Sequence, residues 1–289
     1  MHTHGDNLRQ KETGDAKYAD AKSRKHLREI RARYDQWRKA NEELCGPLRG
    51  PSPEDANIIA KRVMLFSEYK DFLDQQHFAE HFDARSNLHS SLLEEFIYLL
   101  FRDLVKGFTE DALIGKAHTF KDIFFVAPNF DSMVSQPHAR IEEKDHDFVI
   151  GVNISASLTC KGKELVQKQT LQIPAVAIEC KTYLDKTMLE GASTAAEQLK
   201  ARNPNAIYIV VAEWLKLTGS INLKKFKVDQ IYILRKQRNT DREFRYLPGY
   251  QKNPIHADVV LHLFETVRDH LTRDWQGGVA HGLERGYLL

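Results

Sequence analysis

The spacing of apolar residues along the first part of the chain predicts two helices joined by a short linker. From about Asp20 to Leu44, apolar side chains recur every three or four positions, which is typical of a helix with one buried face. This helix is basic and its apolar stripe is narrow, so it could pack on the body of the protein or on a partner. The Gly- and Pro-rich segment 45–53 breaks it, and a second helix is predicted to begin at Ser52 or Pro53. The stripe consists of Leu27, Ile30, Tyr34, Trp37 and Leu44, with Asn41 in the same row.

After about residue 85 the pattern changes to that of an α/β unit. Residues 90–101 predict a helix with a serine cap, acidic residues in its first turn and a wide apolar face. Further helices are predicted over about 186–202 and 257–275, and strands alternate with them, which is an α/β arrangement. The predicted organisation is therefore a loose arm, 1–15, a helical N-terminal region, 16–84, and an α/β core, 85–289. The strand-like runs are Ile123–Ala127, Phe148–Ile154, Gln172–Cys180, Ala206–Ala212 and Gln230–Leu234.

Composition excludes several classes of protein. The chain has 289 residues, of which 42% are hydrophobic, so global disorder is not expected. Its apolar runs are too short to cross a bilayer, and its polar first residues do not resemble a signal peptide. Three scattered cysteines suggest neither a disulfide framework nor a zinc cluster. We expect a cytoplasmic protein of a reducing compartment, without a membrane partner.

The charge is nearly balanced overall but unevenly distributed. With 42 Lys and Arg against 40 Asp and Glu, the formal net charge is +2. Segment 9–39 holds 11 basic and 5 acidic residues, and segment 216–245 holds 9 and 3, so each carries a local charge of +6. Two such blocks are a modest indication of a polyanionic partner, although either could be a solvated surface.

The segment Pro174-Ala-Val-Ala-Ile-Glu-Cys-Lys181 is the most informative one for chemistry. In a strand its side chains alternate, so Cys180 points into the core while Glu179 and Lys181 share the other face. Two alanines on that face leave room for something to approach. A glutamate and a lysine at the end of a buried strand are unusual for packing alone, although an ion pair at the strand end would explain them too.

A second strand supplies a matching carboxylate. Asp147 opens the apolar run Phe148–Ile154, and if this strand neighbours the other, Asp147 can meet Glu179 across the pair. Two close carboxylates repel each other unless a cation bridges them, and hard oxygen ligands suit Mg²⁺ or Mn²⁺. A lysine beside such an ion can orient a water or stabilise charge on a phosphate.

These residues resemble the PD-(D/E)XK nuclease superfamily. The resemblance rests on Asp147-Phe-Val-Ile, Ile178-Glu-Cys-Lys181 and the helix and apolar strand that follow, and it covers roughly residues 85–235. It implies a central mixed sheet flanked by helices. His146 stands where the superfamily usually has proline, and the long gap between the two acids implies an extended hairpin with Lys161-Gly-Lys163 near its tip. Segment 179–191 looks most like type II restriction endonucleases, of the heterodimeric kind that BbvCI represents.

The resemblance implies a role for each matched residue. Asp147 and Glu179 would bind Mg²⁺ or, in its place, Mn²⁺, and Lys181 would position or activate the attacking water. Such families often add an acid from the preceding helix, which here would be Glu94, since Ser90-x-x-Leu93-Glu94 best matches the pattern. Glu95 is the alternative to Glu94, and Asp145 is the alternative to Asp147. Either glutamate could instead complement a helix N-terminus.

The implied reaction is metal-assisted hydrolysis of a phosphodiester bond in double-stranded DNA at a specific sequence. The helical N-terminal region would contact DNA or a partner, and the active species would be a homodimer or a heterodimer with a related subunit. A repair or structure-specific nuclease, or a DNA-binding subunit with a catalytic partner, are the alternatives. Candidate DNA contacts are Arg235, Lys236, Arg238, Arg242 and Arg245.

One further motif competes with this interpretation. His77-Phe-Ala-Glu80-His81 has the order H-x-x-E-H of inverzincin peptidases, in which two histidines one helical turn apart bind zinc. That family's third ligand is a glutamate some 75 residues further on, but residues 150–163 contain none and Glu164 fits poorly. A helix end at the protein surface is the favoured interpretation of the motif.

Overall fold

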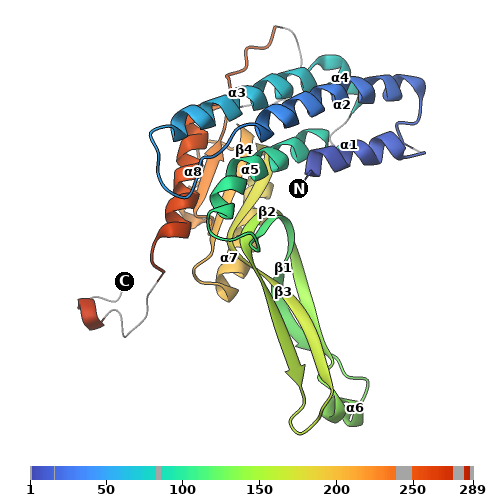
Figure 1. The fold of residues 1–289 in the computed structure, drawn as a ribbon, viewed down its shortest axis with the longest axis vertical. Helices are drawn as coiled ribbons and strands as arrows, with labels where there is room; N and C mark the ends of the chain where they lie inside the picture. The colour runs from blue at the N-terminus through green and yellow to red at the C-terminus, as the bar shows by residue number, and fades with distance from the viewer. Residues whose placement is uncertain (1, 16, 83–85, 239–248, 276–282, 287–289) are drawn as a thin grey trace.

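The computed structural model describes residues 2–15, 17–82, 86–238, 249–275 and 283–286 as a layered α/β protein with a projecting arm (Figure 1). In the described residues five helices, α1 to α5, precede the first strand, and strands β1, β2 and β3 then build the arm. Helix α5 (Leu88–Lys106) packs on the sheet. The first four helices are α1 (Thr3–Thr13), α2 (Ala21–Glu42), α3 (Asp55–Leu73) and α4 (Gln76–His81).

Residues 3–13, for which the sequence predicts a loose arm, form helix α1. Only two of its larger side chains, His4 and Leu8, are fully buried, so it has no apolar periodicity to detect. Its attachment is polar: the backbone N–H groups of His4 and Gly5 donate hydrogen bonds to Glu95 Oε2 over 2.8 and 3.2 Å. The partner lies about ninety residues away in the chain, where a local pattern cannot reveal it.

The predicted apolar stripe of α2 faces the protein's own core. Asp20 caps the helix by accepting a hydrogen bond from the Ser23 backbone N–H over 2.9 Å. Leu27, Tyr34 and Trp37 are buried in the main hydrophobic core. The stripe therefore packs on the body of the protein and not on a partner.

The rest of the chain builds a five-stranded mixed sheet in the order β1-β2-β3-β4-β5. Strands β1 to β3 pair antiparallel, whereas β3, β4 and β5 pair parallel, with α7 as the crossover between β3 and β4. The sheet and flanking helices confirm the predicted α/β class. The elements are α5 (Leu88–Lys106), β1 (Leu113–Phe125), α6 (Phe130–Ser135), β2 (Ala139–Thr159), β3 (Val166–Leu184), α7 (Lys186–Arg202), β4 (Ile207–Leu215), the 3₁₀ turn η2 (Leu223–Lys225), β5 (Gln230–Ile233) and α8 (Ala257–Thr272).

Each face of the sheet carries its own hydrophobic core. On one face, alternate side chains such as Phe148, Ile178 and Ile209 pack against α2, α3, α5 and α8. On the other face, Ala177 and Val210 pack against the alanines and leucines of α7. The division into a helical N-terminal region and a core beginning at 85 stays a prediction, because α2 and α3 share the first of these cores.

Strands β1, β2 and β3 are longer than predicted because they continue beyond the body as an arm that carries α6 near its far end (Figure 1). The predicted hairpin tip at residues 161–163 is confirmed. Gly162 has φ +76° there, a left-handed conformation that glycine adopts without strain. In the described part of the chain, no helix has the length and apolar character needed to span a membrane.

Candidate active site

A pocket of about 350 Å³ opens where α5 meets the central strands. Its lining includes Glu94 from α5, Lys116 from β1, Asp147 from β2 and Lys181 from β3. Four chain segments that are distant in sequence thus bring two acids and two lysines to one cavity. Three of these four residues were singled out from the sequence.

Asp147 and Glu179 come from neighbouring strands, as the sequence predicts. The antiparallel pairing of Phe148 with Ile178 places the two acids opposite each other at the next position along. The Cys180 backbone N–H donates a 2.9 Å hydrogen bond to Asp147 Oδ2 and fixes that carboxylate across the two strands. Cys180 itself is buried in the core, as expected.

An irregularity in β2 turns Asp147 toward the pocket. Opposite β1, Gly115 pairs with Val149 and Ala117 pairs with His146, so β2 spans three residues where β1 spans two. Simple alternation, which the sequence interpretation assumed, therefore fails at Asp147. His146, at the usual proline position, is buried edge-on against the Tyr208 ring, with centroids 5.6 Å apart.

Lys181 bridges the two acids. Its Nζ lies 2.6 Å from Glu179 Oε1 and 3.6 Å from Asp147 Oδ2. Burial alone would lower the pKa of Lys181, but the attraction of the two carboxylates outweighs it and raises the pKa. The lysine is therefore a fixed positive charge between two potential metal ligands.

The two bridged acids have opposite pKa shifts. Burial raises the pKa of Asp147, helped by repulsion from Glu179, and Lys181 offsets only part of this. Burial also opposes ionisation of Glu179, but Lys181 and the Tyr208 hydroxyl outweigh it, so the pKa of Glu179 is lowered. The Tyr208 hydroxyl donates a 3.0 Å hydrogen bond to Glu179 Oε2, which holds the carboxylate in place from the next strand.

Glu94 is the exceptional acid of the site. Its side chain is buried, and Oε2 has no hydrogen-bond partner among the described residues. Burial, together with repulsion from Asp147, raises the pKa of Glu94 to about 7. A buried carboxylate oxygen without a donor is costly, and in a pocket with other acids it is the arrangement that a cation would satisfy.

Its neighbour Glu95 points the other way. Glu95 accepts hydrogen bonds from the backbone of α1, from the Tyr34 hydroxyl over 2.8 Å and from Arg38 over 2.7 Å. Glu95 therefore anchors α1 and α2, and of the two glutamates only Glu94 reaches the pocket. Neither acid complements the N-terminus of its own helix, because α5 begins at Leu88, earlier than the predicted serine cap, and has no acid in its first turn. Glu95 instead complements the N-terminus of α1, through the His4 and Gly5 N–H groups.

Asp145, the alternative to Asp147, lies outside the pocket. Its carboxylate is 73% exposed and pairs with His118 Nδ1 over 2.5 Å. Among the acids weighed from the sequence, Glu94, Asp147 and Glu179 are thus the set whose oxygen atoms could together hold a hard divalent cation such as Mg²⁺ or Mn²⁺.

Two details of the sequence interpretation need correction. Ala177, expected to leave room for an approaching ligand, is instead fully buried in the core that α7 covers. Arg235, a predicted DNA contact, is 1% exposed and donates a 2.7 Å hydrogen bond to Glu213 and another to the Asn253 carbonyl. Burial in an ion pair makes it unavailable to a phosphate.

The other predicted DNA contacts have different positions. Lys236 is exposed and pairs with Asp258 over 2.5 Å, and Arg238 is exposed beside β4. Arg242 and Arg245 lie outside the described residues.

Lys116 and Tyr208 belong to the site but were not predicted from the sequence. Lys116 follows Gly115, which has φ +118°, and its charge lowers the pKa of Glu94 and of Asp147 against the effect of burial. A lone exposed lysine on a strand gives no sequence signal. Tyr208 stands in an apolar strand where a buried tyrosine is ordinary.

The H-x-x-E-H residues do not form a peptidase site. His81 Nε2 lies 2.6 Å from Ser23 Oγ, and Glu80 accepts a 2.7 Å hydrogen bond from Gln76 on its own helix. Of the motif residues, His77 belongs to a group of three potential metal ligands whose other two members come from α2, and the His81 ring packs edge-on against one of these, His26, at 5.2 Å.

Comparison with known proteins gives one family and one fold. The family described as Bpu10I restriction endonuclease matches residues 85–288. A solved structure titled "native BbvCI A2B2 tetramer at low resolution" aligns over 95% of this chain and 97% of its own, with a TM-score of 0.68 and 18% sequence identity. No curated protein matches the chain.

Proposed function

The chain belongs to the Bpu10I restriction endonuclease family and is a type II restriction endonuclease, and on this premise we propose that it cleaves double-stranded DNA in a Mg²⁺-dependent reaction at the Glu94–Asp147–Glu179–Lys181 site. The observation that carries the proposal is the convergence in one pocket of a buried, unpartnered Glu94 oxygen with Asp147 and Lys181. An ion pair at a strand end would account for Lys181 and Glu179, but it would not account for Glu94.

Glu94, Asp147 and Glu179 would hold the metal through their oxygen atoms. When bound, a divalent cation there would neutralise charge on the scissile phosphate and acidify a coordinated water. Burial and repulsion between acids disfavour the charged forms of Glu94 and Asp147 without a cation, which supports a site built for one. Mn²⁺, which accepts the same ligands, would substitute.

Lys181 would position the attacking water and stabilise negative charge on the phosphate. Its Nζ is within reach of both Glu179 and Asp147, and binding of a cation by those acids would release it toward the pocket. Tyr208 is a positioning residue that acts through Glu179. Lys116, on the pocket wall, would attract the DNA backbone.

Cutting both strands requires two active sites or two visits, so we place a second nuclease subunit in the active assembly. The fold is shared with BbvCI, which is described as an A2B2 tetramer. The exposed Lys236 and Arg238 remain candidates for phosphate contacts. The three free cysteines fit a cytoplasmic location, where thiols stay reduced.

Incubation of the purified chain with supercoiled plasmid tests this function. In Mg²⁺ or Mn²⁺ we expect discrete linear fragments, and in EDTA intact plasmid. Nicked circles alone would assign the chain to one half of a two-subunit enzyme. Cleavage without sequence preference would favour a structure-specific nuclease, and metal-independent binding without cleavage would favour a DNA-binding subunit that relies on a catalytic partner.

A further inference from the structure

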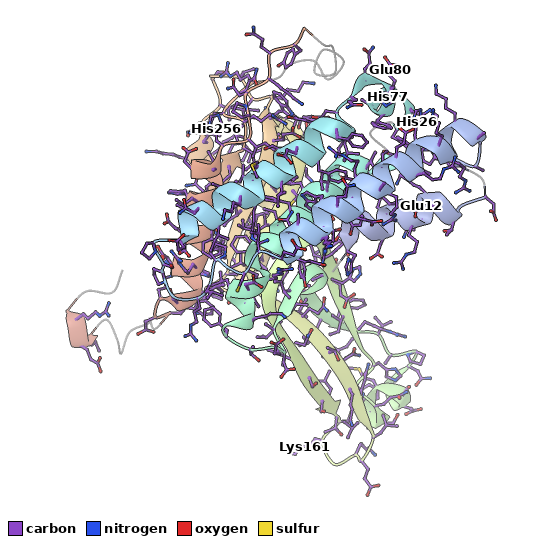
Figure 2. All side chains as sticks on the ribbon, turned by 45° about the horizontal axis from the view of Figure 1, so that its top comes forward. Glu12, His26, His77, Glu80, Lys161 and His256 are labelled. Atoms are coloured by element: carbon purple, nitrogen blue, oxygen red, sulfur yellow. The ribbon has the colours of Figure 1, made fainter. Side chains whose placement is uncertain are left out.

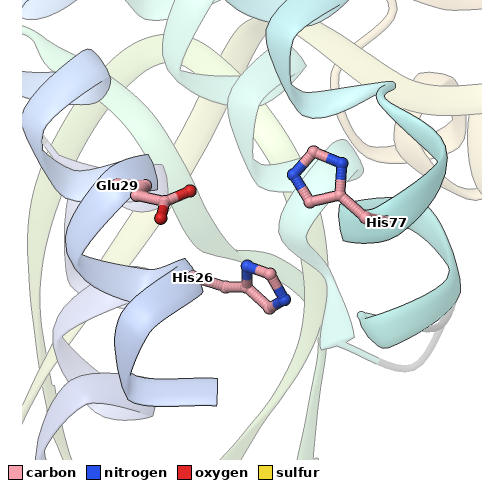
Figure 3. A group of neighbouring side chains, drawn as sticks. All are labelled: His26, Glu29 and His77. Atoms are coloured by element: carbon pink, nitrogen blue, oxygen red, sulfur yellow. The ribbon is translucent and has the colours of Figure 1, made fainter. Parts of the chain in front are cut away.

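Two histidines and a glutamate gather at the surface between α2 and α4. His26 and Glu29 belong to α2 and His77 belongs to α4. Figure 2 labels His26 and His77 on these two helices. One ligand atom from each lies within 4.8 Å of the others, and Figure 3 shows the three side chains directed into the space between the helices. None of them lines the nuclease pocket.

The two ring nitrogens of His26, Nδ1 and Nε2, are buried without a hydrogen bond that would account for them among the described residues. The ring packs edge-on against Phe78 at 5.2 Å and lies 5.4 Å from the His77 ring between centroids. Burial, reinforced by His81 and His77, lowers the pKa of His26.

The histidine and glutamate that complete the H-x-x-E-H motif are engaged elsewhere. His81 contacts Ser23, whose hydroxyl also bonds to the Asp20 carboxylate that caps α2. Glu80 is held by Gln76. The potential metal-binding partners of His77 are therefore His26 and Glu29 of α2, and not His81 one turn along its own helix.

We propose that His26, Glu29 and His77 bind a Zn²⁺-class divalent cation that clips α4 to α2. Two imidazoles and one carboxylate are the ligand types that borderline ions such as Zn²⁺ prefer over Mg²⁺. Glu29 and His77 are exposed, so the fourth position is open to water. Bonds of 2.0–2.1 Å at the tetrahedral angle require donor separations of about 3.4 Å, which rotation of these two exposed side chains can provide.

The test is Zn²⁺ binding by the full chain, measured by equilibrium dialysis in excess Mg²⁺ so that the nuclease acids are occupied. We expect one Zn²⁺ site in the wild type, weakened at least about tenfold in His26→Gln and in His77→Gln. Matched controls are His256→Gln, a partly exposed histidine beside a single aspartate, and Glu80→Gln, which alters the motif but not the cluster. Both controls should bind as the wild type does.

Two further measurements distinguish Zn²⁺ binding at this cluster from an effect of misfolding and from binding by the H-x-x-E-H residues. The Tm of every variant in EDTA should match that of the wild type, whereas Zn²⁺ should raise the Tm of the wild type and not that of His77→Gln. X-ray absorption of the Zn²⁺-loaded protein should show two imidazole ligands. Absence of Zn²⁺ binding by the wild type, or unchanged binding in both His26→Gln and His77→Gln, would overturn the proposal. So would loss of binding confined to His77→Gln and His81→Gln.

Discussion

Glu94 and Glu95 are adjacent in sequence and opposite in purpose. Glu95 has four donors and fastens the first two helices to α5, whereas Glu94 has a buried oxygen with no described donor. The Glu95 carboxylate therefore stabilises the fold, whereas the Glu94 carboxylate destabilises it and lines the pocket.

Replacing each glutamate by glutamine should separate these two roles. In metal-free buffer, Glu94→Gln should raise the free energy of unfolding by roughly 1–3 kcal/mol, because it removes a buried charge and its repulsion from Asp147. Glu95→Gln should lower it by about 3–5 kcal/mol, because it breaks the buried pair with Arg38. Urea denaturation in EDTA measures both, and a loss of stability in Glu94→Gln would contradict the assignment.

At the residue scale, the sequence predicts which side chains meet when two neighbouring strands pair. The antiparallel pairing of the two strands was enough to bring Asp147 opposite Glu179, whereas the irregularity in β2 next to Asp147 could not be predicted from alternation. The choice of Glu94 over Glu95 depended on resemblance, because both lie on a helix whose start was predicted two residues too late. Lys116 and Tyr208 reach the site because their strands pair with neighbouring strands, and no local sequence pattern predicts this.

At the element scale, a buried charge network joins α3 to the parallel strands. Lys70 Nζ lies 2.5 Å from Asp74 Oδ1 and 3.2 Å from Glu213 Oε2, and Glu213 also pairs with Arg235. This network explains why Arg235, in a basic segment of the sequence, turns inward. A count of basic residues cannot reveal which of them has a buried acidic partner.

Glu213→Gln should destabilise the protein by about 3–5 kcal/mol, since it leaves Lys70 and Arg235 buried with less negative charge. Glu68→Gln, at an exposed position on α3, is the matched control and should have little effect. Urea denaturation at neutral pH measures both. Equal stability of the two variants would show that the network contributes nothing.

The same network sets the response to acid. Burial alone would raise the pKa of Asp74, but Lys70, His89 and Lys252 outweigh it, and Lys70 and Arg235 likewise lower the pKa of Glu213. Depressed folded-state pKa values contribute stability above the ordinary carboxylate pKa of about 4. We therefore expect the wild-type Tm to fall as the pH drops below about 4. In Glu213→Gln the fall should be shallower, and parallel curves would contradict this cause.

At the scale of the whole molecule, the projecting arm is unusually apolar. Phe125 is 57% exposed and Phe130 is 76% exposed, and the arm carries further exposed apolar side chains. Exposed apolar surface of this extent is typical of a protein interface. The hydrophobic pattern predicted strands here but not how far they extend beyond the body. The exposed apolar residues of the arm are Phe124, Phe125, Val126, Phe130, Met133, Val134, Val152, Ile154, Leu165 and Val166.

We predict that a second copy of the chain covers this arm. Analytical ultracentrifugation of the wild type should show a dimer or a larger assembly, and the double variant Phe125→Ser and Phe130→Ser should shift it toward monomer without lowering the Tm. Met64→Ser with Leu223→Ser, which alters two exposed apolar residues away from the arm, is the control. A monomeric wild type, or an arm variant that assembles normally, would count against this surface.

The most direct test of the active centre compares two aspartates on one strand. Asp147 lies in the pocket, and Asp145, two residues earlier, faces solvent. In a plasmid-cleavage assay with Mg²⁺, Asp147→Asn should reduce the rate at least roughly 100-fold, because a metal ligand and its charge are lost. Asp145→Asn should cleave at nearly the wild-type rate, and neither variant should lower the Tm. Full activity in Asp147→Asn, or equal losses in the two variants, would contradict the placement of the active centre in this pocket.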